Sequence, residues 1–212
     1  MPDLPPEIAF ELGEVALRRL RPDDAAALAG LRSDAEIVRW SSPGGCTLDE
    51  AARAIAEADE DWRSGKRAEL AIVQSTDDAL VGSISLTFYG EARASVGFDV
   101  AAAARGRGIA TRAVATLCAW ALAAFPELVR LELWALPGND ASMRVAERTG
   151  FHREGVFRSR LPFGDELRDV VVFSRLRSDP APPQPRASTC SRSAPVPTSS
   201  TGTPSARSTS ST

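Results

Sequence analysis

The chain has 212 residues, of which 43% are hydrophobic and 25% charged, a length and composition that suit one soluble domain with a sizeable core. The formal net charge is −3 at pH 7 and the arginines are spread along the chain, so the charge pattern does not predict nucleic-acid binding. No apolar run reaches membrane-spanning length and the acidic, proline-rich start is unlike a secretory signal, so we expect a cytoplasmic protein without a membrane partner.

The first third of the chain reads as a strand followed by helices. We expect residues 1–13 to be a flexible N-terminus and Val15 to Leu20 to form a short strand. Pro22-Asp23-Asp24 then opens a helix that we expect to break near Ser33-Asp34. Thr47-Leu48-Asp49-Glu50 has the form of a capping box, which predicts a second helix ending near Arg63.

The middle of the chain alternates strand patterns with one long helix. Residues 70–73, 80–86 and 95–100 predict three consecutive strands of an antiparallel meander. An apolar helix from Ile109 to Ala124 follows, and residues 129–135 alternate polar and apolar positions as a fifth strand does. The order of elements predicts an α/β fold whose central sheet is of mixed direction.

The last part of the domain is a helix and a closing hairpin. Asn139 precedes a helix that ends at Gly150, and residues 155–161 and 168–176 flank a turn as two strands. From residue 179 the composition changes to Pro, Ser, Thr, Ala and Arg, which cannot bury enough apolar surface to offset the entropy of ordering. We therefore expect one domain over 14–178 and a disordered tail over 179–212.

The most informative stretch is Arg105-Gly106-Arg107-Gly108-Ile109-Ala110-Thr111, which stands at a predicted strand-to-helix turn. Two glycines let the backbone approach a ligand without a Cβ in the way, and the helix start presents unpaired N–H groups. Arg105 and Arg107 add positive charge to this position. The turn is therefore predicted to be an anion site.

Together these motifs resemble the GCN5-related N-acetyltransferase (GNAT) superfamily, and within it the RimJ/RimL branch. The resemblance covers roughly residues 15–179 and depends on the following pieces in this order: Leu17-Arg18 with Arg21-Pro22-Asp23-Asp24, Val96-Gly97-Phe98, Arg105 to Thr111, Asn139-Asp140-Ala141-Ser142, Gly150-Phe151 with Glu154-Gly155, and Asp169 to Leu176. It implies a GNAT fold, a mostly antiparallel sheet flanked by helices and splayed between its fourth and fifth strands, residues 95–100 and 129–135.

The resemblance also implies acetyl-coenzyme A as cosubstrate. The family pattern Arg/Gln-x-x-Gly-x-Gly/Ala, which holds the pyrophosphate, is matched by Arg105, Gly108 and Ala110. The pantetheine arm would pair with the fourth strand, and a backbone N–H near Val100 would hold the thioester oxygen. The residues expected to bind the cosubstrate are Phe98, Asp99, Val100, Arg105, Gly106, Arg107, Gly108, Ile109, Ala110, Thr111, Asn139 and Ser142.

The expected catalytic residues are Asn139 and Ser142. Asn139 suits a helix N-cap as well as a ligand role, and both roles are compatible. Many relatives place a tyrosine where this chain has Ala146, and the RimJ/RimL branch instead offers the serine at the Ser142 position as the acid. A serine is a weak acid, so Ser142 is expected chiefly to hydrogen-bond the departing sulfur.

The general base is not evident from the resemblance. The glutamates that relatives use fall at Ser95 and Leu161 in this chain, and neither position is acidic. An amine must lose a proton before attack, so a carboxylate is the natural acceptor. The candidates are Asp99, which alternates with its neighbours and so faces away from them, Glu69 and Glu36, whereas Glu154 is expected to belong to a structural turn.

The acceptor is left open at this point. Residues 40–46 and 161–165 are the loops expected to contact it, and it is a protein N-terminal amine, an aminoglycoside-like compound, or a polyamine or amino acid. We expect direct attack in a ternary complex, carried out by a monomer or homodimer. No metal is expected, and Cys46, Cys118 and Cys190 show no metal-ligand spacing. The alternative is an acyl-coenzyme A-binding sensor or interaction module without turnover.

Overall fold

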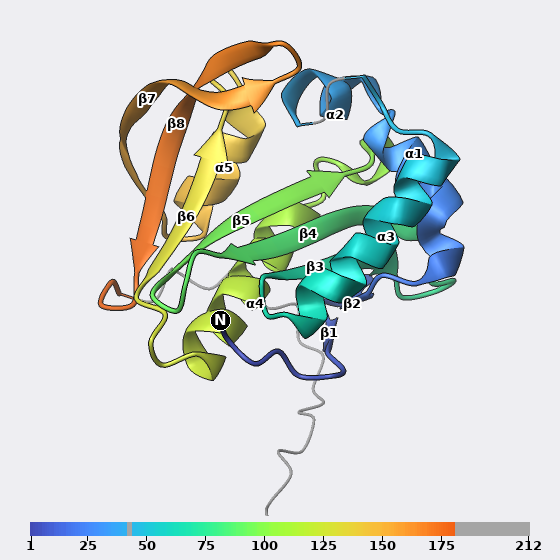
Figure 1. Cartoon of the computed structure of the whole chain (residues 1–212), viewed down its shortest axis with the longest axis horizontal. Coiled ribbons are helices and arrows are strands. Elements are labelled where there is room, and N and C mark those ends of the chain that lie inside the picture. The colour runs from blue at the N-terminus through green and yellow to red at the C-terminus, as the bar shows by residue number, and fades with distance from the viewer. Residues whose placement is uncertain (42–43, 181–212) are drawn as a thin grey trace, which may run out of the picture.

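The computed structural model describes residues 1–41 and 44–180 and contains an eight-stranded sheet flanked by helices (Figure 1). The strand order is β1-β2-β3-β4-β5-β6-β8-β7, and every neighbouring pair is antiparallel except β5 and β6, which are parallel. This is the mixed, mostly antiparallel α/β sheet that the sequence predicts. The strands are β1 (Ala9–Glu11), β2 (Val15–Arg19), β3 (Arg67–Gln74), β4 (Leu80–Phe88), β5 (Arg93–Val100), β6 (Arg130–Ala135), β7 (His152–Phe163) and β8 (Glu166–Leu176).

The helices form a layer on each face of the sheet. On one face, α1 and α3 pack over β3 and β4, whereas α4 and α5 lie behind the sheet as Figure 1 is drawn. The helices are α1 (Ala25–Arg32), α2 (Ala35–Trp40), α3 (Leu48–Arg63), α4 (Ile109–Ala124) and α5 (Asp140–Arg148), with short 3-10 turns at Pro22–Asp24 and Ala102–Ala104. None of the helices in the described ranges is long and apolar enough to cross a membrane.

Two local hydrogen-bond patterns begin α2 and α3 where the sequence predicts. The Asp34 carboxylate accepts hydrogen bonds from the backbone N–H groups of Glu36 and Ile37, so it caps α2 and breaks the first helix in two. Thr47 and Glu50 bond each other's backbone N–H groups in the predicted capping box, and α3 ends at Arg63.

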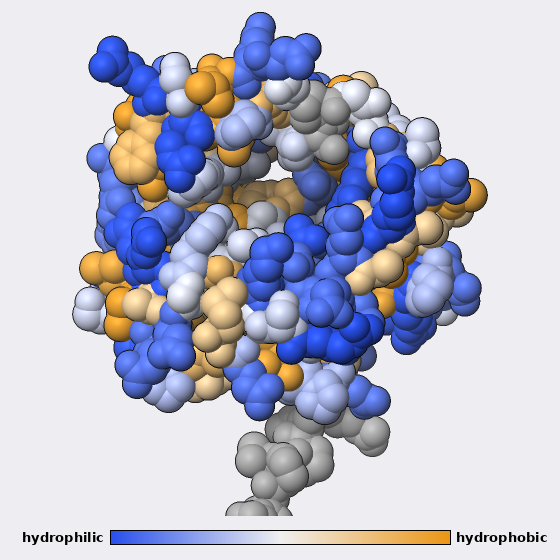
Figure 2. Space-filling model, in the orientation of Figure 1, coloured by the Kyte–Doolittle hydropathy of each residue, from blue (hydrophilic) through white to orange (hydrophobic). Residues whose placement is uncertain are grey.

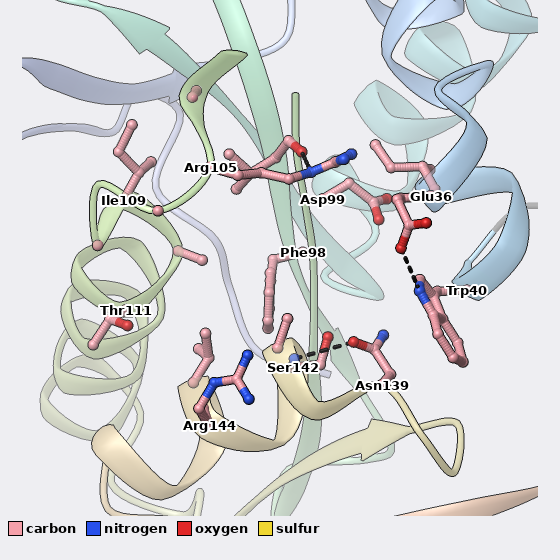
Figure 3. A pocket seen from close by; sticks show the side chains of 18 of the residues that line it. Glu36, Trp40, Phe98, Asp99, Arg105, Ile109, Thr111, Asn139, Ser142 and Arg144 are labelled. Atoms are coloured by element: carbon pink, nitrogen blue, oxygen red, sulfur yellow. Dashed lines mark hydrogen bonds between the residues drawn. The ribbon is translucent and has the colours of Figure 1, made fainter. Parts of the chain in front are cut away.

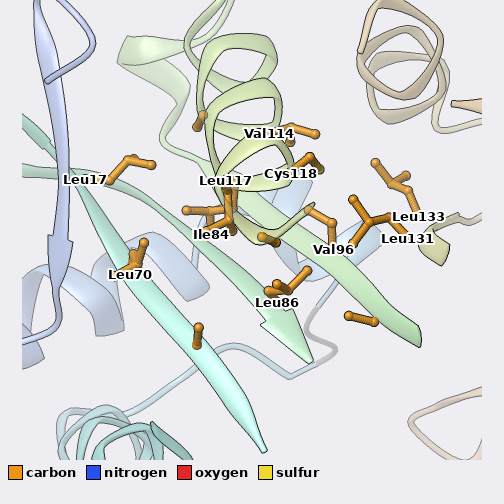
Figure 4. Close-up of a cluster of buried hydrophobic side chains, with 14 of the residues drawn as sticks. Leu17, Leu70, Ile84, Leu86, Val96, Val114, Leu117, Cys118, Leu131 and Leu133 are labelled. Atoms are coloured by element: carbon orange, nitrogen blue, oxygen red, sulfur yellow. The ribbon is translucent and has the colours of Figure 1, made fainter. Parts of the chain in front are cut away.

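The main core lies between α4 and the sheet (Figure 4). The inward positions of α4 recur every three or four residues, and Val114, Leu117 and Cys118 meet Ile84 and Val96 of the sheet. Burial raises the pKa of the Cys118 thiol to about 12, so this side chain is a packing residue and a poor nucleophile.

The N-terminal residues differ from the predicted flexible stretch over 1–13. β1 adds an edge strand to β2, Leu4 is buried, and the Trp62 indole N–H donates to the Pro5 carbonyl oxygen at 2.8 Å. Three residues of strand are too short to give a periodic pattern, so only the tertiary contacts define this segment. The predicted tail, apart from residues 179 and 180, lies outside the described residues.

The sheet divides where β5 meets β6. The parallel ladder joins four residue pairs, from Arg93 with Arg130 to Val96 with Leu133. Beyond these pairs the strands diverge, so the ends of both strands, residues 97–100 and 134–135, border an opening in the sheet. This is the splay expected between the fourth and fifth strands of the sequence prediction, which are β5 and β6 here.

Candidate functional site

A cavity of about 300 Å³ lies where the glycine turn, the open end of β5 and the start of α5 come together (Figure 3). Gly106 and Gly108 both have positive φ, +78° and +72°, and Gly108 is the residue from which α4 begins. A residue with a Cβ is disfavoured in this conformation by roughly 1–2 kcal/mol, so the two glycines shape the turn. The N–H groups of the first turn of α4 therefore begin at the cavity wall.

The cavity gathers almost all of the residues that the sequence singles out. The exception is Arg107, and the predicted residues that line the cavity are Phe98, Asp99, Val100, Arg105, Gly106, Gly108, Ile109, Ala110, Thr111, Asn139 and Ser142. The prediction thus locates one continuous surface contributed by three elements far apart in the chain.

The two arginines of the glycine turn serve the fold more than the cavity. Arg105 donates from Nε to the Val100 carbonyl oxygen at 2.9 Å and forms an ion pair with Asp34. Arg107 pairs with Glu14, as does Arg112, and it does not line the cavity. These bonds hold the pKa values of the Asp34 and Glu14 carboxyls below their usual range. Arg105 lines the cavity as predicted while holding these contacts, and Arg107 does not line it.

Two further arginines, which the sequence prediction did not include, line the cavity. Arg144 and Arg148 of α5 line the cavity, and Figure 3 shows Arg144 on its α5 side. Over residues 1–41 and 44–180, no carboxylate forms an ion pair with either. The sequence could have indicated both arginines, because positions 141, 144, 145 and 148 share one face of a helix.

The start of α5 confirms one of the two roles expected of Asn139. Its side-chain oxygen accepts a hydrogen bond of 3.2 Å from the Ser142 backbone N–H, so Asn139 is the N-cap of α5. This bond uses the backbone of Ser142 and leaves the hydroxyl group to face the cavity. Both residues line the cavity as predicted.

Asp99 lies in the cavity, which the alternation of β5 alone did not reveal. Phe98 and Val100 pack on the core that includes α4, and the Asp99 side chain points to the opposite face, where its Oδ1 accepts a hydrogen bond of 2.8 Å from Ser41 Oγ. A gap in a sheet is open to both faces, so side chains on either face of β5 line the same cavity. Burial raises the pKa of the Asp99 carboxyl, against the hydrogen bond from Ser41.

The remaining candidate carboxylates have different surroundings. Glu36 lines the cavity, and its Oε2 accepts a hydrogen bond of 2.9 Å from the Trp40 indole. Glu69 is buried between Arg32 and Arg67 and does not line the cavity. Glu154 accepts hydrogen bonds from Arg130 and Ser174, which lower its pKa to about 2, as expected of a structural residue.

A second cavity, of about 260 Å³, lies beyond the opening between β5 and β6. It shares Trp40, Ser41, Phe98, Asn139 and Ser142 with the first cavity, so the two meet at these residues. Figure 2 shows the molecule hollowed between α2 and the β7–β8 hairpin. Of the loops expected to contact an acceptor, Trp40, Ser41 and Leu161 line this second cavity, whereas Cys46 does not.

Comparison with known proteins gives the family. Residues 14–152 match the family described as acetyltransferase (GNAT) domain. The chain is 31% identical over 136 residues to the probable N-acetyltransferase YjcK of Bacillus subtilis, covering 63% of this chain and 75% of the relative. It is 30% identical over 174 residues to the putative ribosomal N-acetyltransferase YdaF of the same species, covering 78% and 92%.

Solved structures share the fold. RimJ of Mycobacterium smegmatis, in complex with a coenzyme A disulfide, superposes with a TM-score of 0.68 and 25% identity, covering 76% of this chain and 81% of that one. The ribosomal-protein-S5-alanine acetyltransferase of Vibrio fischeri gives 0.71 and 22%, covering 81% and 98%. Since the family match spans more than half of its residues, the chain belongs to the GNAT family of acetyltransferases.

Proposed function

We propose that this chain transfers the acetyl group of acetyl-coenzyme A to a primary amine by direct attack in a ternary complex. The observation that carries the proposal is the pair of joined cavities. One begins at the start of α4 and follows the open end of β5, and the other continues beyond the opening between β5 and β6. A cosubstrate and an acceptor approaching through separate cavities would meet at Ser41, Phe98 and Ser142.

The α4 end of the first cavity suits the phosphate groups of coenzyme A. Nothing lies within 4 Å of the position that a Cβ would occupy at Gly106, so a ligand has room to approach the backbone. Hydrogen bonds to a charged group contribute roughly 1.5–3 kcal/mol each, so a few N–H groups of α4 suffice to anchor the ligand. Arg144 and Arg148 supply the positive charge that Arg105 and Arg107 commit elsewhere.

The open end of β5 suits the pantetheine arm. Its backbone at Phe98 to Val100 borders the opening, where an extended ligand can pair as an added strand does. A backbone N–H near Val100 would then hold the thioester oxygen, where negative charge develops during attack. RimJ of M. smegmatis, which was solved with a coenzyme A disulfide, supports this use of the fold.

Asp99 and Ser142 fit the two proton positions of the reaction. The neutral amine nitrogen forms a C–N bond to the acetyl carbon and loses a proton to the Asp99 carboxylate, and the C–S bond breaks so that coenzyme A leaves as a thiolate. Ser142, at the junction of the two cavities, hydrogen-bonds the departing sulfur. Among the carboxylates considered, Asp99 and Glu36 line the cavity, and Asp99 is the one on the strand that borders the opening.

Acetyl-coenzyme A consumption against a panel of primary amines tests the proposal. We expect turnover on at least one amine, together with saturable coenzyme A binding. Coenzyme A binding without turnover on any amine would instead favour a sensor or interaction module. Absence of both binding and turnover would remove the assignment of the cavity to the cosubstrate.

A further inference from the structure

The cavity beyond the opening, named here the acceptor pocket, has no charged side chain among the described residues that line it. Its polar groups are hydroxyls and one amide, from Ser41, Ser85, Thr87, Ser95, Asn139 and Ser142, and two indoles, Trp40 and Trp134, whose N–H groups donate to Glu36 and Glu132. The first cavity differs in this respect, because carboxylates and guanidinium groups line it. If the proposed function holds, the acceptor pocket surrounds the substituent of the amine and not the phosphates of the cosubstrate.

Strand register explains the hydroxyl groups on the floor of the acceptor pocket. Thr87 of β4 pairs with Ser95 of β5, and Ser85 of β4 pairs with Gly97, so these positions share one face of the sheet. A Cβ at Gly97 would lie 3.2 Å from Ser85 Oγ, so the glycine keeps room above this hydroxyl. The floor is therefore a polar but uncharged surface.

The carboxylates nearest in register are already paired. Glu69 lies opposite Ser85 and bonds Arg32 and Arg67. Glu132 lies opposite Ser95, and its two oxygens accept hydrogen bonds from Arg130 and from the Trp134 indole. Neither side chain lines the acceptor pocket, so neither is available to a cationic group placed there.

Each of the two tryptophan walls of the acceptor pocket has a guanidinium group over its ring. Trp40 and Trp134 line it, and the guanidinium groups of Arg39 and Arg160 lie 4.5 and 4.9 Å from the centres of these rings. Neither arginine lines the pocket itself. Glu36, which pairs with Arg39 at 3.8 Å, and Asp99 line the first cavity instead. A second ammonium group on an acceptor would thus meet no carboxylate among the described residues that line the pocket.

We propose that the acceptor pocket selects a monoamine with a small, uncharged, hydrogen-bonding substituent and rejects an acceptor that places a second ammonium group there. The proposal rests on the proposed function, and it disfavours polyamines and aminoglycosides as acceptors. Hydroxyl groups both donate and accept hydrogen bonds, so they match a substituent hydroxyl or amide. A buried charge without a partner is costly, whereas such a neutral group is satisfied by the floor.

The full-length protein can be assayed with two acceptors of nearly equal size. Serinamide carries a hydroxyl group, and 2,3-diaminopropionamide carries an ammonium group at the same position. We expect kcat/KM to be at least about tenfold higher for serinamide, given that an unpaired charge is far less readily buried than a hydroxyl group. The kcat/KM for a short peptide with an N-terminal serine, compared with that for serinamide, shows whether the acceptor is a polypeptide or a small molecule of the same chemistry. Equal rates for the two amides, or a preference for the diamine, would overturn the proposal.

A charge-introducing variant provides the second test. Thr87→Asp places a carboxylate on the pocket floor and should shift the ratio of kcat/KM values toward 2,3-diaminopropionamide by about tenfold or more. Thr76→Asp makes the same substitution at an exposed position in the turn between β3 and β4, and should leave the ratio unchanged. An unchanged ratio in Thr87→Asp, with coenzyme A affinity retained, would overturn the pocket assignment. Failure to acetylate any acceptor would overturn the proposed function itself.

Discussion

Ser41 Oγ donates a hydrogen bond of 2.8 Å to Asp99 Oδ1 and so connects the C-terminal end of α2 to the open end of β5. Burial raises the pKa of the Asp99 carboxyl, while this hydrogen bond and the positive charges of Arg32 and Arg105 oppose the rise and the charge of Glu69 adds to it. A general base accepts a proton only when ionised, so if Asp99 is the base, as proposed, its pKa should set the acid limb of the pH profile.

Asp99→Asn should lower kcat by about 10²-fold or more, the usual contribution of a general base, and should remove the acid limb from the profile of kcat/KM against pH. Ser41→Ala removes a bond to the ionised form, so the pKa rises further and the limb moves to higher pH. Glu36→Gln removes the other carboxylate considered at this cavity and should leave the limb in place. An acid limb that persists in Asp99→Asn would assign the base elsewhere.

Gly108→Asp should abolish coenzyme A binding in a calorimetric titration, because it places a carboxylate at the start of α4 where phosphate groups are expected. Gly108→Asn is the matched control, since asparagine has a similar size, tolerates positive φ and carries no charge. The difference in affinity between the two variants isolates the effect of charge from that of backbone strain. Equal affinities would contradict the phosphate assignment.

Arg144→Gln should weaken coenzyme A binding by about tenfold, the equivalent of one charge-assisted hydrogen bond. Arg107→Gln should change the Kd far less, because Arg107 faces Glu14 and does not line the cavity. Binding measured on both variants at the same salt concentration discriminates them. A larger loss in Arg107→Gln would show that the glycine turn uses its own arginine when the ligand binds.

Ser142→Ala should reduce kcat more than it reduces affinity for coenzyme A. The substitution keeps the backbone N–H that donates a hydrogen bond to the Asn139 side chain. The start of α5 is therefore preserved and only the hydroxyl group is lost. Comparing kcat with the Kd for coenzyme A separates a role at the sulfur from a role in binding. Unchanged turnover would remove Ser142 from the reaction.

Glu154 should make the folded state sensitive to acid. Hydrogen bonds from Arg130 and Ser174 lower its pKa from about 4.5 to about 2, so they stabilise the fold when the carboxyl is ionised. That stabilisation is complete above the unfolded pKa of about 4.5 and is lost as the pH falls toward about 2. Denaturation midpoints in this window should fall more steeply for the native protein than for Glu154→Gln.

Local sequence signals were sufficient for most elements of the fold. Both ends of α4, the capping box at Thr47 and the break at Asp34 follow from residues within one helical turn. The partners of Arg105 and Arg107 did not follow, because Asp34 and Glu14 lie 71 and 93 positions away along the chain. Only the folded chain shows which charges are already paired.

The sequence predicted most residues of the candidate site but not the shape of the cavity that they line. The glycine turn, Asn139 and Ser142 were predicted from motifs and line the cavity. Asp99 could not be placed, because alternation along β5 assigns a side chain to a face of the sheet and does not show that the sheet opens there. The uncharged lining of the acceptor pocket depends on register between strands, which no single stretch of sequence contains.

The short ladder between β5 and β6 also affects how ligand binding in the cavity changes the stability of the domain. β6, β8 and β7 form one block of the sheet, and four residue pairs are its strand-to-strand attachment to the block of β1 to β5. A molecule bound in the opening contacts both blocks and links them. Because a ligand that binds only the native state raises the free energy of unfolding, the stability of the whole domain should rise as the cavity is filled.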